Sequence, residues 1–262
     1  HKSFLEISFV ILTFNQKRMR LVIDFGNTLV KYYVFDRSKI VDATSTKSKD
    51  WQKPLVAFRT KHPDLEGGIL SDVQGVHTEA LLEALSPLPM QICGMHLDLP
   101  FQTRYQSPQQ LGADRIALAA AACVHFPNQH RLVIDLGSCI TSDFIDKNND
   151  HWGGTISPGF GMRYKSLHQF SGKLPLLDFQ APKNPIGNST AEAIYSGVYY
   201  GIINEVEGQI ARYQQDFKDL TLILTGGDAE RLPKPLKNSI FAHSNFLATG
   251  LNYILDLNTP GW

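Results

Sequence analysis

Cysteine is scarce in this chain, and the cysteines that are present form no recognisable pattern. There are three of them, Cys93, Cys123 and Cys139, and they lie far apart in the sequence. No CxxC pair occurs, and no Cys/His cluster has the spacing of a zinc site. A fold held by a disulfide framework is therefore excluded, and a reducing cytoplasm is the compartment that we expect.

The chain also lacks an excess of charge of either sign and a long apolar run. Lys+Arg and Asp+Glu both number 25, so no overall field attracts nucleic acid or an anionic membrane surface. The apolar run at residues 7–12 is short, follows Glu6 and lacks the small-residue cleavage site of a signal peptide. We therefore expect neither a nucleic-acid partner nor a membrane association.

Two common phosphate-binding signatures are missing as well. The sequence contains no GxxxxGK[ST] loop, which disfavours a P-loop enzyme. It contains no GxGxxG motif after a strand either, because Gly159 and Gly161 are followed by Tyr164 where the third glycine belongs. A dinucleotide-binding enzyme is disfavoured for the same reason.

One pattern occurs twice. Residues 21–36 and residues 132–146 share the order of an apolar run, an Asp, a spacer, a Gly, a small polar residue and a second apolar run. The pattern predicts two β-hairpins in which Asp24 and Asp135 occupy equivalent places. An internal repeat of this kind indicates two similar halves that face each other across a cleft.

Strands and helices alternate along the chain, which indicates an α/β fold. Beyond the hairpins we expect strands at residues 56–58, 68–73, 91–93 and 220–225, and helices at 78–85, 111–126, 190–217 and 246–257. The helix at 111–126 is Ala-rich and apolar on almost every side, so it should be buried between layers.

Three segments follow from these elements. The chain begins with His1, and Met19 immediately precedes the first strand, so we interpret residues 1–18 as an added or upstream segment. A polar turn at residues 127–131 predicts the boundary between the halves. We therefore expect an N-terminal domain at residues 19–127 and a C-terminal domain at residues 128–262.

The turn at residues 24–28 has the chemistry of a phosphate loop. Gly26 lets a phosphate approach the backbone, Asn27 and Thr28 offer side-chain donors, and Asp24 can hold Mg²⁺, usually through water. Taken alone, the same residues fit an ordinary tight hairpin equally well. The second hairpin repeats them, which favours two phosphate loops that converge on a nucleotide. Its corresponding residues are Asp135, Gly137 and Ser138.

A third glycine site follows the strand at 220–225. Thr225, Gly226 and Gly227 precede a predicted helix start, where backbone amides can meet a phosphate or a flat base. A purely structural strand-to-helix turn explains the same residues, so this motif is weak by itself.

Asp114 and Arg115 lie at the start of the helix at 111–126. Asp114 is either a first-turn acid, paired with Arg115, or a catalytic carboxylate. We expect the helix dipole to keep it ionised, which suffices for accepting a proton late from an attacking alcohol. Phosphoryl transfer needs no stronger base, because its catalysis rests on positioning and charge neutralisation.

Taken in order, these motifs resemble those of type III pantothenate kinases. The resemblance covers about residues 20–255 and rests on Tyr105, Thr190 and residues 24–28, 112–115, 135–143, 153–159, 174–175 and 225–228. It implies the acetate and sugar kinase, Hsp70 and actin-type fold, which consists of two ribonuclease-H-like domains with a nucleotide cleft, usually in a homodimer. It also implies ATP-dependent phosphorylation of the primary hydroxyl of pantothenate, the first step of coenzyme A synthesis, with Mg²⁺ and a monovalent cation, K⁺ or NH₄⁺.

The resemblance further implies roles for single residues. Asp114 would be the general base, and Arg115 would bind the carboxylate or amide region of pantothenate. Asp24 and Asp135 would serve the metal, the cation and the phosphates. The other expected nucleotide contacts are Gly26, Asn27, Thr28, Gly137, Ser138, Thr225, Gly226 and Gly227. The other expected substrate contacts are Tyr105, Gly112, Thr190 and His151, the last two in the same subunit or in its neighbour.

Some of these positions depart from the family pattern or have a simpler explanation. The family usually has Gly-Thr in the second turn, whereas this chain has Gly137, Ser138 and Cys139; serine keeps the hydroxyl, so we expect a modest effect. Tyr105 and His151, considered alone, are more typical of packing positions than of ligand-binding ones.

Two alternative functions stay open. One is a kinase of the same fold with a different acceptor, such as a sugar or another small alcohol. The other is a nucleotide-binding regulatory protein without catalysis. The presence of Asp24, Asp114 and Asp135 together favours an enzyme, because a protein that only binds nucleotide does not require all three acids.

Overall fold

The structure is a computed structural model that describes residues 18–233, 240–241 and 245–259. The predicted upstream segment, residues 1–18, therefore lies outside the described residues except for Arg18. The chain divides into two compact units: His1–Cys93 with Leu251–Trp262 is called unit 1, and Gly94–Gly250 is called unit 2. The boundary predicted at residues 127–131 concerned the two halves of the repeat and stays a prediction.

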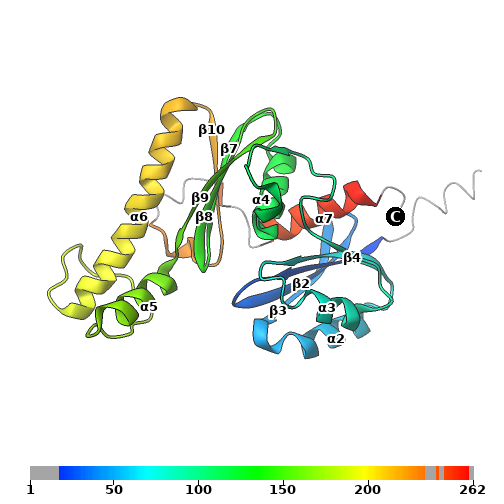
Figure 1. Ribbon diagram of the computed structural model, residues 1–262, viewed down its shortest axis with the longest axis horizontal. Helices are drawn as coiled ribbons and strands as arrows, with labels where there is room; N and C mark the ends of the chain where they lie inside the picture. Colours follow the sequence, from blue (N-terminus) through cyan, green and yellow to red (C-terminus); the bar gives the residue numbers. More distant parts are fainter. Residues whose placement is uncertain (1–17, 234–239, 242–244, 260–262) are drawn as a thin grey trace, which may run out of the picture. The chain divides into compact units, whose positions relative to one another are not determined.

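Unit 1 is built on a five-stranded mixed sheet with the order β3-β2-β1-β4-β5 (Figure 1). The strands are β1 (Met19–Phe25), β2 (Leu29–Asp36), β3 (Lys39–Lys47), β4 (Leu65–Asp72) and β5 (Met90–Ile92), accompanied by the helices α2 (Gln52–Lys61) and α3 (Thr78–Leu85). The first predicted hairpin is confirmed as the antiparallel pair β1–β2, while β4 runs parallel to β1 and β5 parallel to β4. The strand β1 is buried along its whole length, which fits its place at the centre of the sheet.

Unit 2 repeats this order in a six-stranded sheet, β11-β10-β7-β8-β9-β6. Its strands are β6 (Gln102–Thr103), β7 (His130–Leu136), β8 (Cys139–Ile145), β9 (Asp150–Pro158), β10 (Leu220–Thr225) and β11 (Ile240–Phe241). The second predicted hairpin is confirmed as the antiparallel pair β7–β8; β9 is antiparallel to β8, and β10 and β11 are parallel to their neighbours. The repeat thus extends from the hairpins to both sheets, and β6 is an addition at the edge beside β9.

The two acids of the repeat occupy equivalent positions in the sheets. Asp24 is the residue before the last in β1, and Asp135 is the residue before the last in β7. In the neighbouring parallel strand, Asp24 is paired with Ser71 and Asp135 with Thr225. Each acid therefore stands at the end of a central strand, next to a glycine turn.

The sheet of unit 2 has helices on both faces. The helix α4 (Ala113–His125) lies on one face, and α5 (Phe160–Ser171) and α6 (Thr190–Asp216) lie on the other (Figure 1). Successive strand residues point to opposite faces, so the apolar residues 132, 134, 136, 140 and 144 pack on α5 and α6. The intervening residues, which include Asp135 and Asp143, face α4. Most of α4 is buried, as its apolar sequence predicts.

The last helix, α7 (Phe246–Asn258), begins in unit 2 and ends in unit 1. Gly250 on this helix packs closely against α4, because a Cβ atom placed on Gly250 would overlap with the carbonyl oxygen of Ala117. Among the helices in the described ranges, none combines the length and the apolarity that a membrane span requires.

The strand predicted at residues 56–58 is wrong, because these residues lie inside α2. The apolar run Val56-Ala57-Phe58 is too short to define a period by itself. The side chains that fix the helix are Trp51, Leu55 and Phe58, which recur at helical spacing and are all buried.

Two other elements differ from the sequence expectation. The strand β3 lies within the polar stretch after the first hairpin; it is an edge strand whose residues alternate between exposed and half-buried, so it carries little apolar signal. The helix predicted after Gly227 is only a short 3₁₀ turn at Ala229–Arg231.

Replacing two helical glycines by alanine should change stability in opposite directions. The change Gly250→Ala should lower the free energy of unfolding by about 1–3 kcal/mol, because the new methyl group has no space against α4. The change Gly208→Ala in α6 should raise it by roughly 0.5–1 kcal/mol, because no atom lies within 4 Å of the new Cβ and alanine favours the helix. Urea titration of the two variants measures both effects, and a stabilising Gly250→Ala would contradict the close packing of α7 on α4.

Candidate active site

The first predicted phosphate turn connects β1 and β2 in unit 1. The backbone N–H of Gly26 donates to the carbonyl oxygen of Leu29 at 3.0 Å, which closes the turn. The carboxylate of Asp24 is largely buried and lies 4.0 Å from the ammonium group of Lys31. Asn27 accepts a hydrogen bond from the side chain of Gln74 at 2.6 Å. Asn27 and Thr28 are exposed, so this turn presents polar side chains to solvent beside an acid.

The second predicted phosphate turn connects β7 and β8 in unit 2 and is one residue shorter. The N–H of Gly137 donates to the carbonyl oxygen of Cys139 at 2.9 Å, and Ser138 at its tip is exposed. The start of α5 lies directly against this turn, because the N–H of Gly159 donates to the carbonyl oxygen of Ser138 at 3.1 Å. A Cβ atom on Gly159 would overlap with the turn's backbone, so only glycine fits there.

The third glycine site converges on the same turn. Gly226 has a φ of +96°, a conformation that favours glycine, and a Cβ atom there would overlap with the carboxylate of Asp135. The N–H of Asp228 donates to the carbonyl oxygen of Leu136 at 2.9 Å. Three separate glycine motifs of unit 2 thus meet around Asp135. The sequence alone does not predict that Gly159 is one of them.

The acids of the repeat do not form a protein-built metal cage. Within the described residues, no group of three or more His, Cys, Asp or Glu is arranged to hold a metal ion. Mg²⁺ in nucleotide enzymes is commonly bound by one or two carboxylates together with water and substrate phosphates. One carboxylate from each hairpin, that of Asp24 and that of Asp135, fits that mode of binding.

Asp114 stands in the first turn of α4, where its Oδ1 accepts the backbone N–H of Arg115 at 2.8 Å. A Cβ atom on Gly112 would lie 2.5 Å from that oxygen, so glycine leaves space for the carboxylate. Burial raises the pKa of Asp114 above its ordinary value, and this effect exceeds the lowering by the N–H of Arg115. The sequence predicts a carboxylate that the helix terminus keeps ionised, whereas burial makes it a stronger base.

Arg115 is buried and is bound by Asp143, an acid that is not among the predicted site residues. Its Nε and Nη2 atoms donate to the two carboxylate oxygens of Asp143 at 2.9 Å and 2.7 Å. The Oδ1 atom of Asp143 also lies 2.6 Å from Nε2 of His151, and the guanidinium of Arg115 lies 5.5 Å from the ring centre of Tyr105. The signal that points to Asp143 is an acid inside the buried strand β8, on the face that α4 covers.

The structure does not bring all predicted substrate residues together. Tyr105, Arg115 and His151 form one cluster, and Gly112 and Asp114 adjoin it through the start of α4. Thr190 is exposed at the start of α6, on the opposite face of the sheet from α4. Thr190 therefore does not belong to that cluster in the part of the chain that the structure describes.

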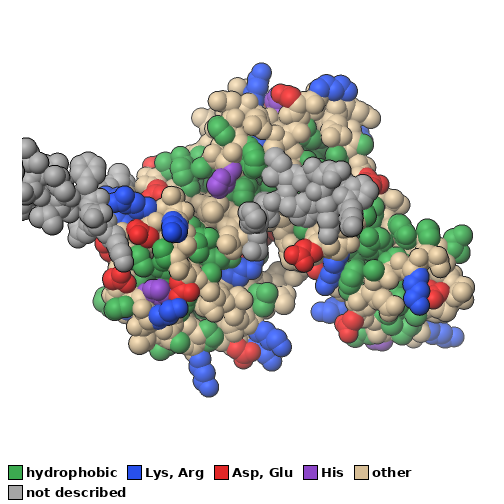
Figure 2. All heavy atoms as spheres, turned by 180° about the vertical axis from the view of Figure 1, so that it is seen from behind, with side chains coloured by type: hydrophobic (Ala, Val, Ile, Leu, Met, Phe, Trp, Pro, Cys, Tyr) green, Lys and Arg blue, Asp and Glu red, His purple; other side chains and the backbone are tan. Residues whose placement is uncertain are grey.

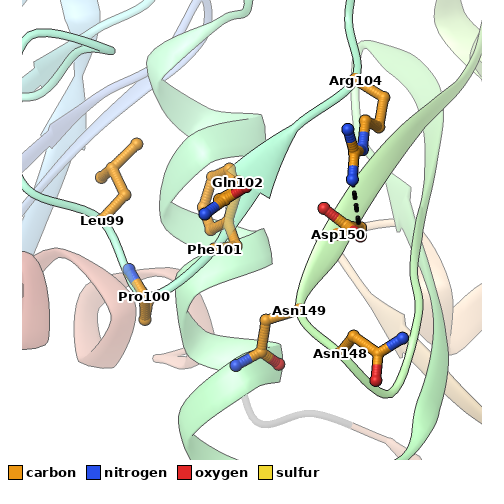
Figure 3. Close-up of a pocket in the computed structure, with 8 residues that line it drawn as sticks. All are labelled: Leu99, Pro100, Phe101, Gln102, Arg104, Asn148, Asn149 and Asp150. Atoms are coloured by element: carbon orange, nitrogen blue, oxygen red, sulfur yellow. Dashed lines mark hydrogen bonds and ion pairs between the residues drawn. The ribbon is translucent and has the colours of Figure 1, made fainter.

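A separate pocket of about 380 Å³ lies in unit 2 beside β6 (Figure 3). Its lining contains the ion pair between Arg104 and Asp150, which are 3.0 Å apart, and none of the predicted site residues. The full lining is Leu99, Pro100, Phe101, Gln102, Arg104, Asn148, Asn149 and Asp150. On the face shown in Figure 2, basic and acidic side chains are interspersed, in keeping with the balanced net charge.

Comparison with known proteins gives concordant matches. A family model described as type III pantothenate kinase matches residues 20–212. A type III pantothenate kinase of Flavobacterium johnsoniae is 42% identical over 234 residues, which cover 89% of this chain and 96% of that protein.

Solved structures match the fold as well. A Baf family protein from Campylobacter jejuni has a TM-score of 0.60 at 23% identity, covering 90% of this chain and 97% of the other. A glucokinase from an Antarctic psychrotroph has a TM-score of 0.52 at 11% identity, covering 93% of this chain and 100% of the other. At these identities the two structures show the fold alone, and it is the actin-like kinase fold with two α/β units.

The change Asp114→Asn should stabilise the protein at neutral pH. Because the folded-state pKa is raised, ionisation of this carboxyl costs stability as the pH rises above its ordinary value of 3.8. Asparagine keeps the Oδ1 acceptor without the charge, so the melting temperature of the variant should exceed that of the wild type at pH 7. The difference should shrink as the pH falls towards 4, and thermal melts across this range measure it. A variant that is less stable at pH 7 would contradict the burial of an ionisable carboxyl at this place.

Proposed function

The chain belongs to the type III pantothenate kinase family, and we propose that it transfers the γ-phosphoryl group of ATP to the primary hydroxyl of pantothenate. The product is 4′-phosphopantothenate, and its formation is the first step of coenzyme A biosynthesis. The observation that carries this proposal is the family match over residues 20–212, which includes both glycine hairpins and the start of α4. The pairing of a raised-pKa acid, Asp114, with a buried Arg115 supports an alcohol acceptor at that place.

The two hairpins would bind the nucleotide. In unit 1, Asp24, Gly26, Asn27 and Thr28 would face phosphates, and in unit 2 the turn around Asp135 would do the same. Asp24 and Asp135 would hold Mg²⁺ and a monovalent cation, K⁺ or NH₄⁺, which neutralise the charge of the phosphates when bound. The other residues assigned to the nucleotide are Gly137, Ser138, Thr225, Gly226 and Gly227.

The start of α4 would bind and activate the acceptor. The pantothenate hydroxyl oxygen attacks the γ-phosphorus, its proton passes to the carboxylate of Asp114, and ADP leaves with the electrons of the broken P–O bond. A raised pKa suits Asp114 to this role, because a base with a pKa nearer to neutrality takes the proton more readily. Arg115, Tyr105 and Gly112 would shape the site for the rest of pantothenate.

Thr190 is exposed at the start of α6, on the opposite face of the sheet from α4, which favours a role towards a second subunit. We propose a homodimer in the cytoplasm, in which Thr190 of one protomer approaches pantothenate bound by its partner. Light scattering on the purified protein measures the oligomeric state, and a monomer at micromolar concentration would remove this part of the proposal.

The purified protein should release ADP from ATP in the presence of Mg²⁺ and K⁺ only when pantothenate is added. A pyruvate kinase and lactate dehydrogenase coupled assay measures this, with a panel of sugars and small alcohols as competing acceptors. If a sugar is turned over faster than pantothenate, the assignment of pantothenate as the acceptor is wrong, and the alternative hypothesis of a kinase with a different acceptor is correct. A rate of ADP release that does not change with any added acceptor would favour the alternative of a regulatory protein.

The change Asp114→Asn should lower kcat by about 10²–10⁴-fold, because proton acceptance in the transition state is lost. Binding of ATP, measured by calorimetry, should stay unchanged, since Asp114 is separate in sequence from the turns proposed to bind the phosphates. The matched control is Asp219→Asn, an exposed acid before β10, which should leave kcat unaltered. An unaltered kcat in Asp114→Asn would remove this residue from the mechanism.

A further inference from the structure

Three of the proposed substrate residues, Tyr105, His151 and Arg115, are joined by a chain of hydrogen bonds that a cation–π contact closes. The backbone N–H of Tyr105 donates to Oγ1 of Thr103 at 3.1 Å, and that hydroxyl lies 3.0 Å from Nδ1 of His151. The other ring nitrogen of His151 lies 2.6 Å from Asp143, which binds both Nε and Nη2 of Arg115. The guanidinium of Arg115 then lies 5.5 Å from the ring centre of Tyr105. The circuit therefore closes on itself.

The circuit assigns a direction to each hydrogen bond. Both carboxylate oxygens of Asp143 accept N–H groups of Arg115, so we assign the hydrogen of the His151 contact to Nε2, which donates to Oδ1 of Asp143. The Thr103 hydroxyl accepts from the backbone of Tyr105 and donates its own hydrogen to Nδ1 of His151. With the hydrogen on Nε2, both ring nitrogens of His151 have a hydrogen-bond partner.

The middle of the circuit is closed to solvent. His151 is 0% exposed, Asp143 is 2% exposed, and the ring of Phe101 packs on His151 with the centroids 5.7 Å apart. Both nitrogens of His151 and both oxygens of Asp143 are already bound by protein groups. Neither side chain is therefore placed to touch a substrate, and both act through other residues.

Arg115 is the residue through which they act. Asp143 holds the guanidinium edge that carries Nε and Nη2, which fixes the plane of the group and directs the edge with Nη1 elsewhere. A bidentate pair of this kind fixes orientation as well as distance. Without Asp143 the same arginine has several rotamers and no defined position next to Asp114 and Tyr105.

We propose that Asp143 is a positioning residue for pantothenate, and that His151 and Thr103 act behind it to hold Arg115 over Tyr105. This inference rests on the proposed function and deepens it, since it names residues that set the acceptor site without touching the acceptor. It assigns His151 to the support of Asp143 instead of to direct substrate contact.

The first test compares steady-state kinetics of Asp143→Asn and wild type with pantothenate and with ATP varied separately. The variant keeps the shape of the side chain but loses one acceptor and the charge. Its KM for pantothenate should rise, and its kcat/KM for pantothenate should fall by about 100-fold, which is the effect expected when a binding group is displaced by about 1 Å. Its KM for ATP should stay at the wild-type value, which a general loss of structure would not allow.

A matched control comes from the same strand. Ser142 is buried on the opposite face of β8, where its hydroxyl lies 2.7 Å from that of Thr155. The change Ser142→Ala removes the two hydrogen bonds that this hydroxyl makes with the side chain and the backbone N–H of Thr155, without touching the circuit. It should leave both KM values unchanged, so an equal effect in this control and in Asp143→Asn would overturn the positioning role.

A double-mutant cycle tests whether Asp143 acts through Arg115. Arg115→Lys keeps the charge but loses the bidentate fork. If the two residues form one unit, the double variant Asp143→Asn with Arg115→Lys has nearly the kcat/KM of Arg115→Lys alone. If the two losses multiply, Asp143 acts independently of Arg115 and the inference is wrong.

A buried Asn in place of Asp143 leaves Arg115 without its counter-charge, and such a variant can fail to fold. Thr103→Val then decides the question, because it changes no charge and lies at the far end of the circuit. It should raise the KM for pantothenate roughly fivefold, which corresponds to the free energy of one hydrogen bond, and leave the KM for ATP unchanged. An unchanged KM for pantothenate in Thr103→Val overturns the inference, whereas a wild type without pantothenate-dependent turnover removes the proposed function as well.

Discussion

Each sheet of the protein is organised by a central strand that pairs antiparallel on one side and parallel on the other. Such a strand is enclosed by backbone partners and by side chains on both faces, so its sequence is apolar along almost its whole length. The polar residues of β1 and β7 lie towards the strand ends. Arg20, His130 and Arg131 stand near the start, and the acid before the last residue, Asp24 or Asp135, sits where the strand meets a glycine turn. The same constraint, applied twice, produces two acids at two strand ends, each beside backbone that a phosphate can approach.

Unit 2 adds the features on which the proposed acceptor site depends. The helix α4 covers the sheet face that carries Asp143, so the arginine at its start can be bound by a strand acid. Burial at this helix start raises the pKa of Asp114, although helix termini usually favour the ionised form of a carboxyl. The same packing thus holds one side chain rigidly and makes its neighbour a better proton acceptor.

Much of the fold can be predicted from the sequence, because the hairpins are repeated and the long helices have clear periodicity. The apolar run at residues 56–58 is too short to distinguish a strand from a turn of helix. The helix forms because it buries Trp51 and Leu55 as well. The edge strand β3 could not be predicted, since its polar residues pair with β2 through the backbone and not through an apolar face.

The predicted site residues divide in a similar way. The acids at 24, 114 and 135 stand in local motifs, whereas Asp143 and Thr103 act through contacts with residues 28 and 48 positions away, which local patterns do not reveal. The central claim is that this chain phosphorylates pantothenate at its primary hydroxyl. Phosphorus NMR of the wild-type reaction with ATP and Mg²⁺ tests it most directly. The expected result is a new phosphomonoester resonance that appears together with ADP. This resonance should be coupled to the methylene protons on the carbon that bears the hydroxyl. ADP with inorganic phosphate and no phosphomonoester would contradict the account.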